Sequence, residues 1–515
     1  MRRVATVLLG FVGILLAGSH YGWASQQEKP KVIRLSEQSP GPIAFPKIDR
    51  RPRPGHPWGS SKMESLPKFD PNSPNPSDVD LRGDDLSKLD LRNNMDALLY
   101  TRFDDDTVWP KLGLMPKGFD PKTIMELGKN PGLGVRTLHE SGITGKGVGV
   151  GIIDQPLLTE HQEYADRLRL YEENNVRDGD RSEMHGPAVA SIAVGRTIGV
   201  APDADLYYIA TRNTDVSRSG TPDNFAFKAQ SIRRLLEVNR QLPADRKIRV
   251  ISMSIGWNAR QDGYDEIMAA CEEAEAAGVF VINCGSVVLH GFTFYGVGRH
   301  PLANPDVFES YEPCAGWLPS RFCSRWYGFL LVPMDSRTMA CRRGSDKYHF
   351  GRTGGFSWVP PYLAGVYALA AQVEPEITPW RFWALAMKTG RLIEVQRQGE
   401  RYSMGPIIDP VRLIRSIRAG ELASFDRKQR RSREELLTLV RQAVGERRIW
   451  FKRTTPEEFR KIAGTPTTEI TCEEGKVLYV YPGVAAMFLR DPRSGNPYII
   501  EYVVCEGRKI DIGQN

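Results

Sequence analysis

Apolar runs alternate with helical patterns between residues 147 and 285, and this alternation constrains the fold more than any other feature of the sequence. Continuous apolar runs, as expected of strands buried on both faces, occupy residues 147–154, 204–211, 248–256 and 279–285. Segments with helical spacing separate them, at residues 186–195, 228–242 and 264–278. Strands that alternate with helices favour a parallel sheet with helices on both faces. We therefore predict an α/β fold built on a doubly wound parallel sheet.

Residues 1–24 have the pattern of a secretory signal peptide. Arg2 and Arg3 precede an apolar run over residues 4–17, and small residues around Ala24 fit a cleavage site. An uncleaved anchor is the alternative, but the run is shorter than the roughly 20 residues that span a bilayer. We expect a secreted or extracytoplasmic protein whose mature chain begins near Ser25, with no stable membrane insertion after cleavage.

Two segments precede the α/β region. Residues 25–78 are rich in Pro, Ser and Lys without apolar periodicity, which predicts a linker or a disordered segment. In residues 79–130, Leu81, Leu86 and Leu91 recur every five residues. This period fits neither a helix nor a strand and resembles a pentapeptide-repeat coil, although a simple packing segment is equally compatible with it. Whether residues 25–130 are a removed pro-segment stays open.

The α/β domain itself is expected over residues 131–420. Residues 421–515 begin with a charged helical pattern and continue with short alternating segments, which predicts a small β-rich α+β appendage. The formal charge of +7 is small for 515 residues and gives no reason to expect a nucleic-acid partner.

The seven cysteines form no CxxC pattern, and no HExxH is present, so we expect no zinc site and no cofactor. Cys271 and Cys284 lie in buried patterns and are expected to be free thiols. In an exported chain, Cys472 and Cys505 are the simplest candidate disulfide, although spacing alone cannot establish it.

Three short motifs carry residues with catalytic chemistry. Asp154 ends an apolar run, His185 opens a small-residue helical pattern, and Ser357 opens another in "GGFSWVPPYLAG". Taken singly, they are a turn residue, a loop histidine and a helix cap. Active groups of open α/β sheets gather at the carboxyl ends of the strands, where all three can meet. Together they can form a triad in which Asp154 orients His185 and His185 takes the proton of Ser357.

The order Asp-His-Ser and the surrounding segments resemble the subtilisin-like (S8) serine peptidases. "GKGVGVGIIDQPL" resembles the family's Asp segment, "HGPAVASIAVG" its His segment and "FSWVPPYLAG" its Ser segment. The resemblance covers residues 130–420 and implies an endopeptidase that cleaves protein or peptide substrates through an acyl-enzyme. "VISMSIG" is similar to the strand that pairs with the substrate, which implies backbone contacts at Ser254, Ile255 and Gly256.

The segment expected to bind the oxyanion departs from the family pattern. Where the family has an Asn donor, "VINCGS" places Ser286, and Asn283 lies three residues earlier. We rank Ser286 above Asn283 as the second donor, beside the backbone N–H of Ser357. Loss of one such donor costs about 100- to 1000-fold in rate. This departure keeps a second hypothesis open, a catalytically weak or silent binding or regulatory protein on the same fold. An α/β-hydrolase is disfavoured, because G-x-S-x-G is missing around Ser357 and His185 precedes it.

Overall fold

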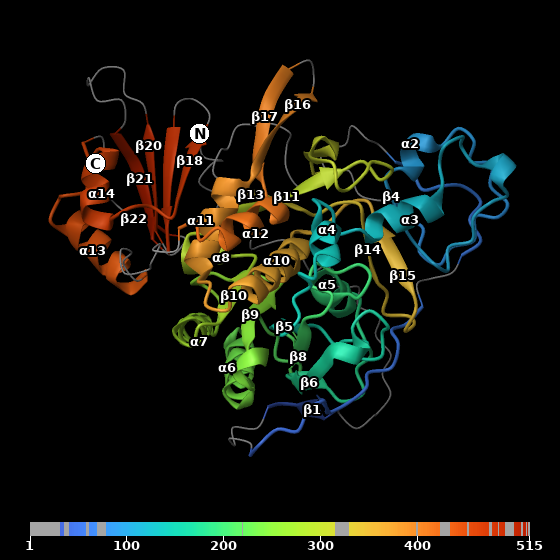
Figure 1. Ribbon diagram of the computed structural model, residues 1–515, viewed down its shortest axis with the longest axis horizontal. Coiled ribbons are helices and arrows are strands. Elements are labelled where there is room, and N and C mark those ends of the chain that lie inside the picture. Colours follow the sequence, from blue (N-terminus) through green and yellow to red (C-terminus); the bar gives the residue numbers. More distant parts are fainter. Residues whose placement is uncertain are drawn as a thin grey trace.

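The computed structural model describes most of the chain (Figure 1). The described residues are 31–35, 41–57, 61–69, 79–218, 220–314, 329–397, 400–422, 433–450, 453–472, 476–482, 484–489, 499–505, 508–510 and 512. The predicted signal peptide and its cleavage site lie outside these residues. Within them, no helix has the length and apolar character needed to cross a membrane.

A six-stranded sheet forms the centre of the α/β domain, and every neighbouring pair in it is parallel. Its strands, in spatial order, are β10 (Phe280–Asn283), β9 (Ile248–Met253), β5 (Gly149–Asp154), β8 (Asp205–Thr211), β6 (Leu168–Asn174) and β2 (Lys47–Ile48). Side chains alternate between the two faces of this sheet, so Ile152 and Ile153 enter different cores. The predicted doubly wound parallel sheet is therefore confirmed.

Helices cover both faces of the central sheet (Figure 1). One face packs against α4 (Val135–Glu140), α5 (His185–Val194), α10 (Val359–Val373), α11 (Pro379–Thr389) and α12 (Pro410–Arg418). The other face packs against α6 (Ala226–Gln241) and α7 (Tyr264–Ala276). Gly365 lets α10 pack closely, because a Cβ atom there would lie 2.5 Å from the Cβ of Val200. This close packing holds the start of α10 near the carboxyl edge of the sheet.

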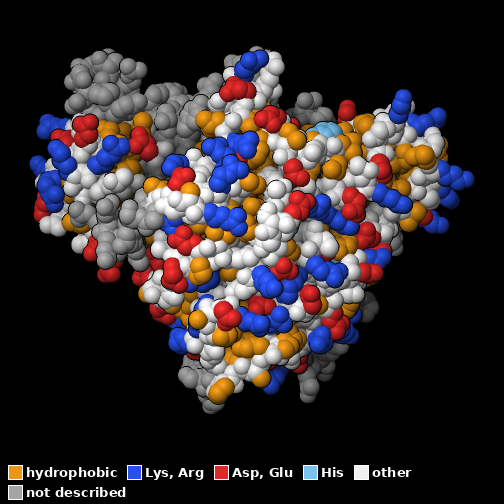
Figure 2. All heavy atoms as spheres, viewed as in Figure 1, with side chains coloured by type: hydrophobic (Ala, Val, Ile, Leu, Met, Phe, Trp, Pro, Cys, Tyr) orange, Lys and Arg blue, Asp and Glu red, His pale blue; other side chains and the backbone are white. Residues whose placement is uncertain are grey.

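A second sheet is built from the region between β10 and α12. Its order is β12 (Tyr311–Pro313), β11 (Phe294–Arg299), β13 (Leu330–Pro333), β17 (Glu400–Ile407) and β16 (Arg391–Arg397). The hairpin of β16 and β17 projects from the body of the domain (Figure 1). Basic and acidic side chains are interspersed over the face shown in Figure 2, so the charge is not gathered in one area of that face.

Part of the segment 25–78, predicted as a linker or a disordered segment, pairs with strands of the α/β domain. β1 (Val32–Ile33) pairs with β7 (Val176–Arg177), and β2 adds to the edge of the central sheet beside β6. Arg50 binds the carboxylate of Glu173 at 2.6 and 3.0 Å, and Glu173 is buried in β6. This polar segment can pack because backbone pairing and ion pairs hold it in place where an apolar face is missing.

The next segment, which contains the five-residue leucine period, runs in stacked turns and is called the solenoid below. Leu81, Leu86 and Leu91 are all buried in one small core. Single parallel bridges join Lys62 to Asp85 and Asp85 to Val108, so corresponding positions of successive turns lie side by side. The regular elements of this region are β3 (Val79–Asp80), α2 (Met95–Leu98), β4 (Thr101–Asp104), α3 (Pro121–Lys129), β14 (Arg337–Ala340) and β15 (Tyr348–Gly351).

The C-terminal region forms a separate α+β layer. It contains α13 (Arg433–Gly445), α14 (Pro456–Ala463), and an antiparallel sheet of β18 (Thr468–Cys472), β19 (Lys476–Tyr481), β20 (Val484–Leu489), β21 (Ile499–Cys505) and β22 (Arg508–Ile510). Cys472 and Cys505 lie on β18 and β21, which β19 and β20 separate. Three strand spacings amount to about 14 Å, whereas a disulfide needs Cα atoms within about 7 Å. The predicted Cys472–Cys505 disulfide is therefore wrong.

Candidate active site

Asp154 is the last residue of β5, at the carboxyl edge of the central sheet. Its side chain is buried, and its Oδ1 accepts hydrogen bonds from the Gln155 backbone N–H at 2.8 Å and from His185 Nδ1 at 2.7 Å. Burial alone would raise the pKa of Asp154. The charge and hydrogen bond of His185, the charge of Lys228 and the Gln155 N–H outweigh burial and lower that pKa below its ordinary value. Asp154 is therefore ionised at neutral pH.

His185 is the first residue of α5, and its ring lies between Asp154 and the start of α10. When Nδ1 donates to Asp154, Nε2 carries the lone pair and can accept a proton. The other side of the ring contacts the indole of Trp358, with ring centroids 5.3 Å apart. The carboxylate and the indole together fix the orientation of the imidazole.

Ser357 lies in a short 3-10 helix, η5 (Phe356–Trp358), that leads directly into α10. Its side chain is largely buried, and its Oγ donates to the Ser254 carbonyl at 3.3 Å. The Ser254 hydroxyl donates in return to the Ser357 carbonyl at 2.7 Å. Among the described contacts, no hydrogen bond joins Ser357 Oγ to His185. Asp154 and His185 are therefore joined by a hydrogen bond. Trp358, the residue after Ser357, packs on the His185 ring, while the Ser357 hydroxyl is bonded to the Ser254 carbonyl.

The three residues predicted to pair with substrate follow β9 at the same edge of the sheet. Ser254 contacts Ser357 as above, while the Ile255 carbonyl already accepts the Cys284 N–H at 3.0 Å. Gly256 lies close to the turn after β10, where a Cβ atom on it would be 3.3 Å from the Gly285 nitrogen. The segment therefore borders Ser357, and its pairing with substrate stays a prediction.

The turn after β10 contains both predicted oxyanion donors. The Ser286 hydroxyl donates to the Asn283 carbonyl at 2.8 Å and accepts from the Asn283 N–H at 3.1 Å, so it is used within its own turn. Asn283 shares the sheet face of Val281 and of its partner Met253, which belong to the core of α6 and α7. Its Oδ1 accepts the Gly285 N–H, and its Nδ2 is buried without a partner among the described residues.

Neither of these side chains therefore points a free donor at Ser357 in this structure. Ser286 opens the short helix α8 (Ser286–His290), where its hydroxyl stabilises the turn. Asn283 has the free donor, on the sheet face opposite to the core of α5 and α10. The observed contacts weaken the preference for Ser286, and the assignment of the second donor stays a prediction.

Two groups near Asp154 were not recognised from the sequence. The Cys284 thiol lies near Asp154 and the start of η5, and burial together with the Asp154 charge raises the pKa of this thiol. A protonated thiol is a poor nucleophile, so Cys284 does not compete with Ser357. The other group is Lys228, which lies at helical spacing from Ile232, Leu235 and Leu236. A lysine on this apolar face was the signal that could have identified it.

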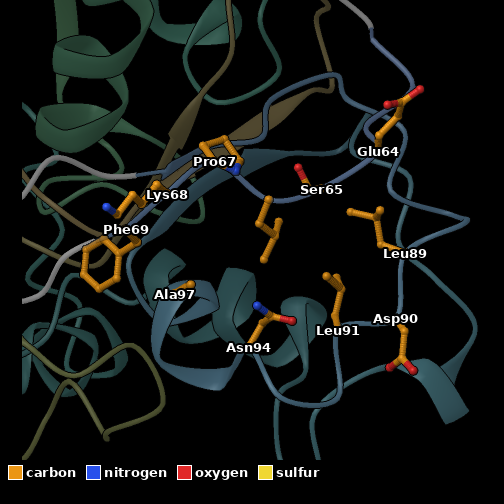
Figure 3. Close-up of a pocket in the computed structure, with 11 residues that line it drawn as sticks. Glu64, Ser65, Pro67, Lys68, Phe69, Leu89, Asp90, Leu91, Asn94 and Ala97 are labelled. Carbon is orange, nitrogen blue, oxygen red and sulfur yellow. The ribbon is translucent and has the colours of Figure 1, made fainter.

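A cavity of about 440 Å³ lies away from these residues, between the solenoid and the segment 64–69 (Figure 3). Its lining combines apolar and charged side chains: Glu64, Ser65, Leu66, Pro67, Lys68, Phe69, Leu89, Asp90, Leu91, Asn94 and Ala97. None of the predicted site residues lines it. Within the described residues, no cluster of three or more His, Cys, Asp or Glu side chains could hold a metal ion.

Comparison with known proteins identifies the family that the α/β domain resembles. Residues 145–286 match the family model described as the subtilase family, a range that contains Asp154, His185 and the turn after β10. The resemblance is confirmed over these residues, and the α/β domain has a subtilisin-like fold. The subtilisin-like protease PopC of Myxococcus xanthus (strain DK1622) is 34% identical over 272 residues. That alignment covers 48% of this chain and 56% of PopC, so the chain spans about half the length of this relative.

Proposed function

We propose that this chain is a serine endopeptidase in which Ser357 is the nucleophile, His185 the general base and Asp154 the residue that orients the base. The hydrogen bond between His185 Nδ1 and Asp154 Oδ1 carries the proposal, because it leaves Nε2 free to accept a proton next to η5. The position of Ser357 at the entrance to α10 supports it, since free N–H groups at a helix start favour a developing negative charge.

Activation of the nucleophile needs a rearrangement from the observed geometry. The Ser357 hydroxyl must exchange its hydrogen bond to the Ser254 carbonyl for one to His185 Nε2. Catalytic hydrogen bonds are often long or unmade before substrate binds. A substrate N–H that takes the Ser254 carbonyl as its acceptor would release the hydroxyl, which couples activation of the nucleophile to substrate binding.

The chemical steps then follow from the roles of the three residues. Ser357 Oγ attacks the carbonyl carbon of the scissile bond while its proton passes to His185. The imidazolium gives that proton to the leaving nitrogen, the C–N bond breaks, and an acyl ester remains on Ser357. Water attacks the ester, its proton passes to His185, and collapse of the intermediate returns the proton to Ser357 as the acid product leaves. Asp154 stabilises the imidazolium in both halves of the cycle.

The oxyanion of each tetrahedral intermediate needs two donors. The first is the Ser357 backbone N–H. For the second we keep the turn after β10, with Ser286 and Asn283 as the candidates, each of which must change its present contacts to serve. Alanine variants at these two positions separate them, because the true donor lowers turnover about 100- to 1000-fold with little change in substrate binding. If both variants turn over normally, the donor lies outside this turn.

Replacing Ser357 by alanine tests the proposal directly. The Ser357→Ala variant should lose peptide hydrolysis while keeping the thermal unfolding profile of the unmodified protein, because within the described part of the chain the hydroxyl makes only one long hydrogen bond. Hydrolysis that continues in this variant would remove Ser357 as the nucleophile.

We further propose that the protein is exported and acts on protein or peptide substrates outside the cytoplasm. The signal-peptide pattern of residues 1–24 supports this placement. N-terminal sequencing of protein from its native host should begin near Ser25. An intact Met1 on intracellular protein would contradict export without affecting the catalytic proposal.

A catalytically weak or silent binding or regulatory protein is the second candidate. Two observations favour it, the Ser286 hydroxyl engaged within its own turn and the Ser357 hydroxyl bonded to Ser254. This candidate predicts that peptides bind without turnover. A peptide library offered to the unmodified protein distinguishes the two, since measurable Ser357-dependent cleavage eliminates the silent protein.

A further inference from the structure

Lys228 is a buried lysine in the third position of α6, and the residue is 3% exposed. Its Nζ donates to the Thr211 carbonyl at 3.1 Å. Lysine is almost never fully buried unless a partner compensates its charge. Since a single carbonyl compensates the charge of an ammonium only weakly, the charged groups around Lys228 must supply the rest of the compensation.

The Thr211 carbonyl places this ammonium at the carboxyl edge of the central sheet. Thr211 ends β8 and directly follows Ala210, which is the register partner of Asp154 on β5. Lys228 therefore reaches, from the helix layer on one face of the sheet, the edge where Asp154 faces His185.

The charged groups facing the two residues come from several elements. Lys228 is attracted by Asp154 and by Asp223 in the loop before α6, while burial lowers the pKa of Lys228 to about 8. Asp154 also faces His185 on α5, and the ionisable groups Tyr208 on β8 and Cys284 after β10 lie near it. Burial raises the pKa values of both Tyr208 and Cys284, which keeps them neutral around pH 7. Lys228 is thus the second cation that acts on Asp154.

We propose that Lys228 is a positioning residue for the Asp154–His185 pair. The buried positive charge of Lys228 also attracts the Asp154 carboxylate and thereby weakens the attraction between this carboxylate and the His185 imidazolium. This inference rests on the proposed function of the triad. Asp154 favours the protonated form of His185, and a general base works best when it is free near the operating pH. A nearby cation moderates the attraction, so His185 becomes available as a base at lower pH than Asp154 alone would allow.

Titration of His185 in a Lys228→Met variant tests this proposal without requiring catalysis. Protein labelled with ¹⁵N-histidine is titrated between about pH 5 and 9 by NMR, and His185 is assigned from the spectrum of a His185→Gln variant. Methionine keeps the length of the lysine side chain and removes its charge. We expect the midpoint of His185 to rise by about half to one pH unit in Lys228→Met. The acidic limb of the kcat/KM profile should move upward by the same amount where activity is measurable.

Lys146→Met is the matched control, since it removes the same charge at the opposite end of β5, in an exposed turn. Its His185 midpoint should equal that of the unmodified protein. Lys228→Arg, which keeps the charge, should retain the original midpoint. A Lys228→Met midpoint that stays or falls overturns the proposal, provided that thermal unfolding shows a folded variant. An upward shift in a protein without peptidase activity would support the role of Lys228 and reject only the proposed function.

Discussion

The indole of Trp358 lies against the imidazole of His185, with centroids 5.3 Å apart and ring planes inclined by 32°. Trp358 is buried and directly follows Ser357 in the chain. The residue after the candidate nucleophile therefore packs on the candidate base. Any shift of η5 moves Ser357 and the support of His185 together, which ties the geometry of the two groups to one short segment.

Trp358→Ala should lower kcat/KM, because His185 loses the ring that holds its orientation. Aromatic contacts of this kind contribute about 0.5–1.5 kcal/mol, which corresponds to a decrease of roughly 2- to 12-fold. Trp358→Phe keeps a ring at this position and should recover most of the loss. Steady-state kinetics of the two variants check this, and equal losses in both would mean that the stacking contributes nothing.

Arg50→Ala should destabilise the fold, because it leaves the buried carboxylate of Glu173 without its guanidinium partner. The Glu173 side chain is 1% exposed and Arg50 is 22% exposed, so we expect a loss of about 2–3 kcal/mol. Arg51→Ala is the control, since the side chains of Arg51 and Glu160 are both more than half exposed and such pairs contribute about 0–1 kcal/mol. Urea unfolding measures both variants. Equal free energies of unfolding for the two variants would show that the ion pair of Arg50 does not stabilise the sheet.

Lys228 should make the stability of the fold depend on pH in the alkaline range. Burial lowers the pKa of Lys228 from 10.5 to about 8, against the attraction of Asp154 and Asp223. Between these two pH values the unfolded chain binds a proton that the folded chain lacks, so the contribution of Lys228 to the free energy of unfolding rises with pH. Below about pH 8 both states are protonated and the penalty of burying the charge is complete.

Chemical denaturation at a series of pH values checks this prediction. Because other groups also titrate in this range, the informative quantity is the difference in stability between the unmodified protein and Lys228→Met. That difference should change in favour of the unmodified protein as the pH rises above 8. A difference that is constant with pH would show that Lys228 titrates at its ordinary value.

Features encoded by local patterns were predictable from the sequence. The apolar runs identified β5, β8, β9 and β10, because strands buried on both faces are rich in apolar residues. Thr378 followed by Pro379 is a local start signal for α11, and the Thr378 side chain accepts the Arg381 N–H. The leucines at the five-residue period, Leu81, Leu86 and Leu91, are all buried in the core of the solenoid.

Features that depend on distant partners were not predictable in this way. The segment around Arg50 has no apolar period, and it packs because Glu173 and the edge of β6 lie more than 100 residues away. Excluding a disulfide between Cys472 and Cys505 required the order of the strands, which the spacing of cysteines along the sequence does not give. The engagement of the Ser357 hydroxyl by Ser254 depends on the contact between β9 and η5, far apart in sequence.

Covalent labelling with a fluorophosphonate probe tests the central claim most directly, because the probe reacts with a serine only when a base activates it. Peptide mapping of labelled protein should find the probe on Ser357, and His185→Ala should abolish this labelling by removing the base. Asp154→Asn should slow it strongly, since the imidazole loses the carboxylate that orients it. Absence of labelling at Ser357 in folded, unmodified protein, or labelling that persists in His185→Ala, would contradict the account.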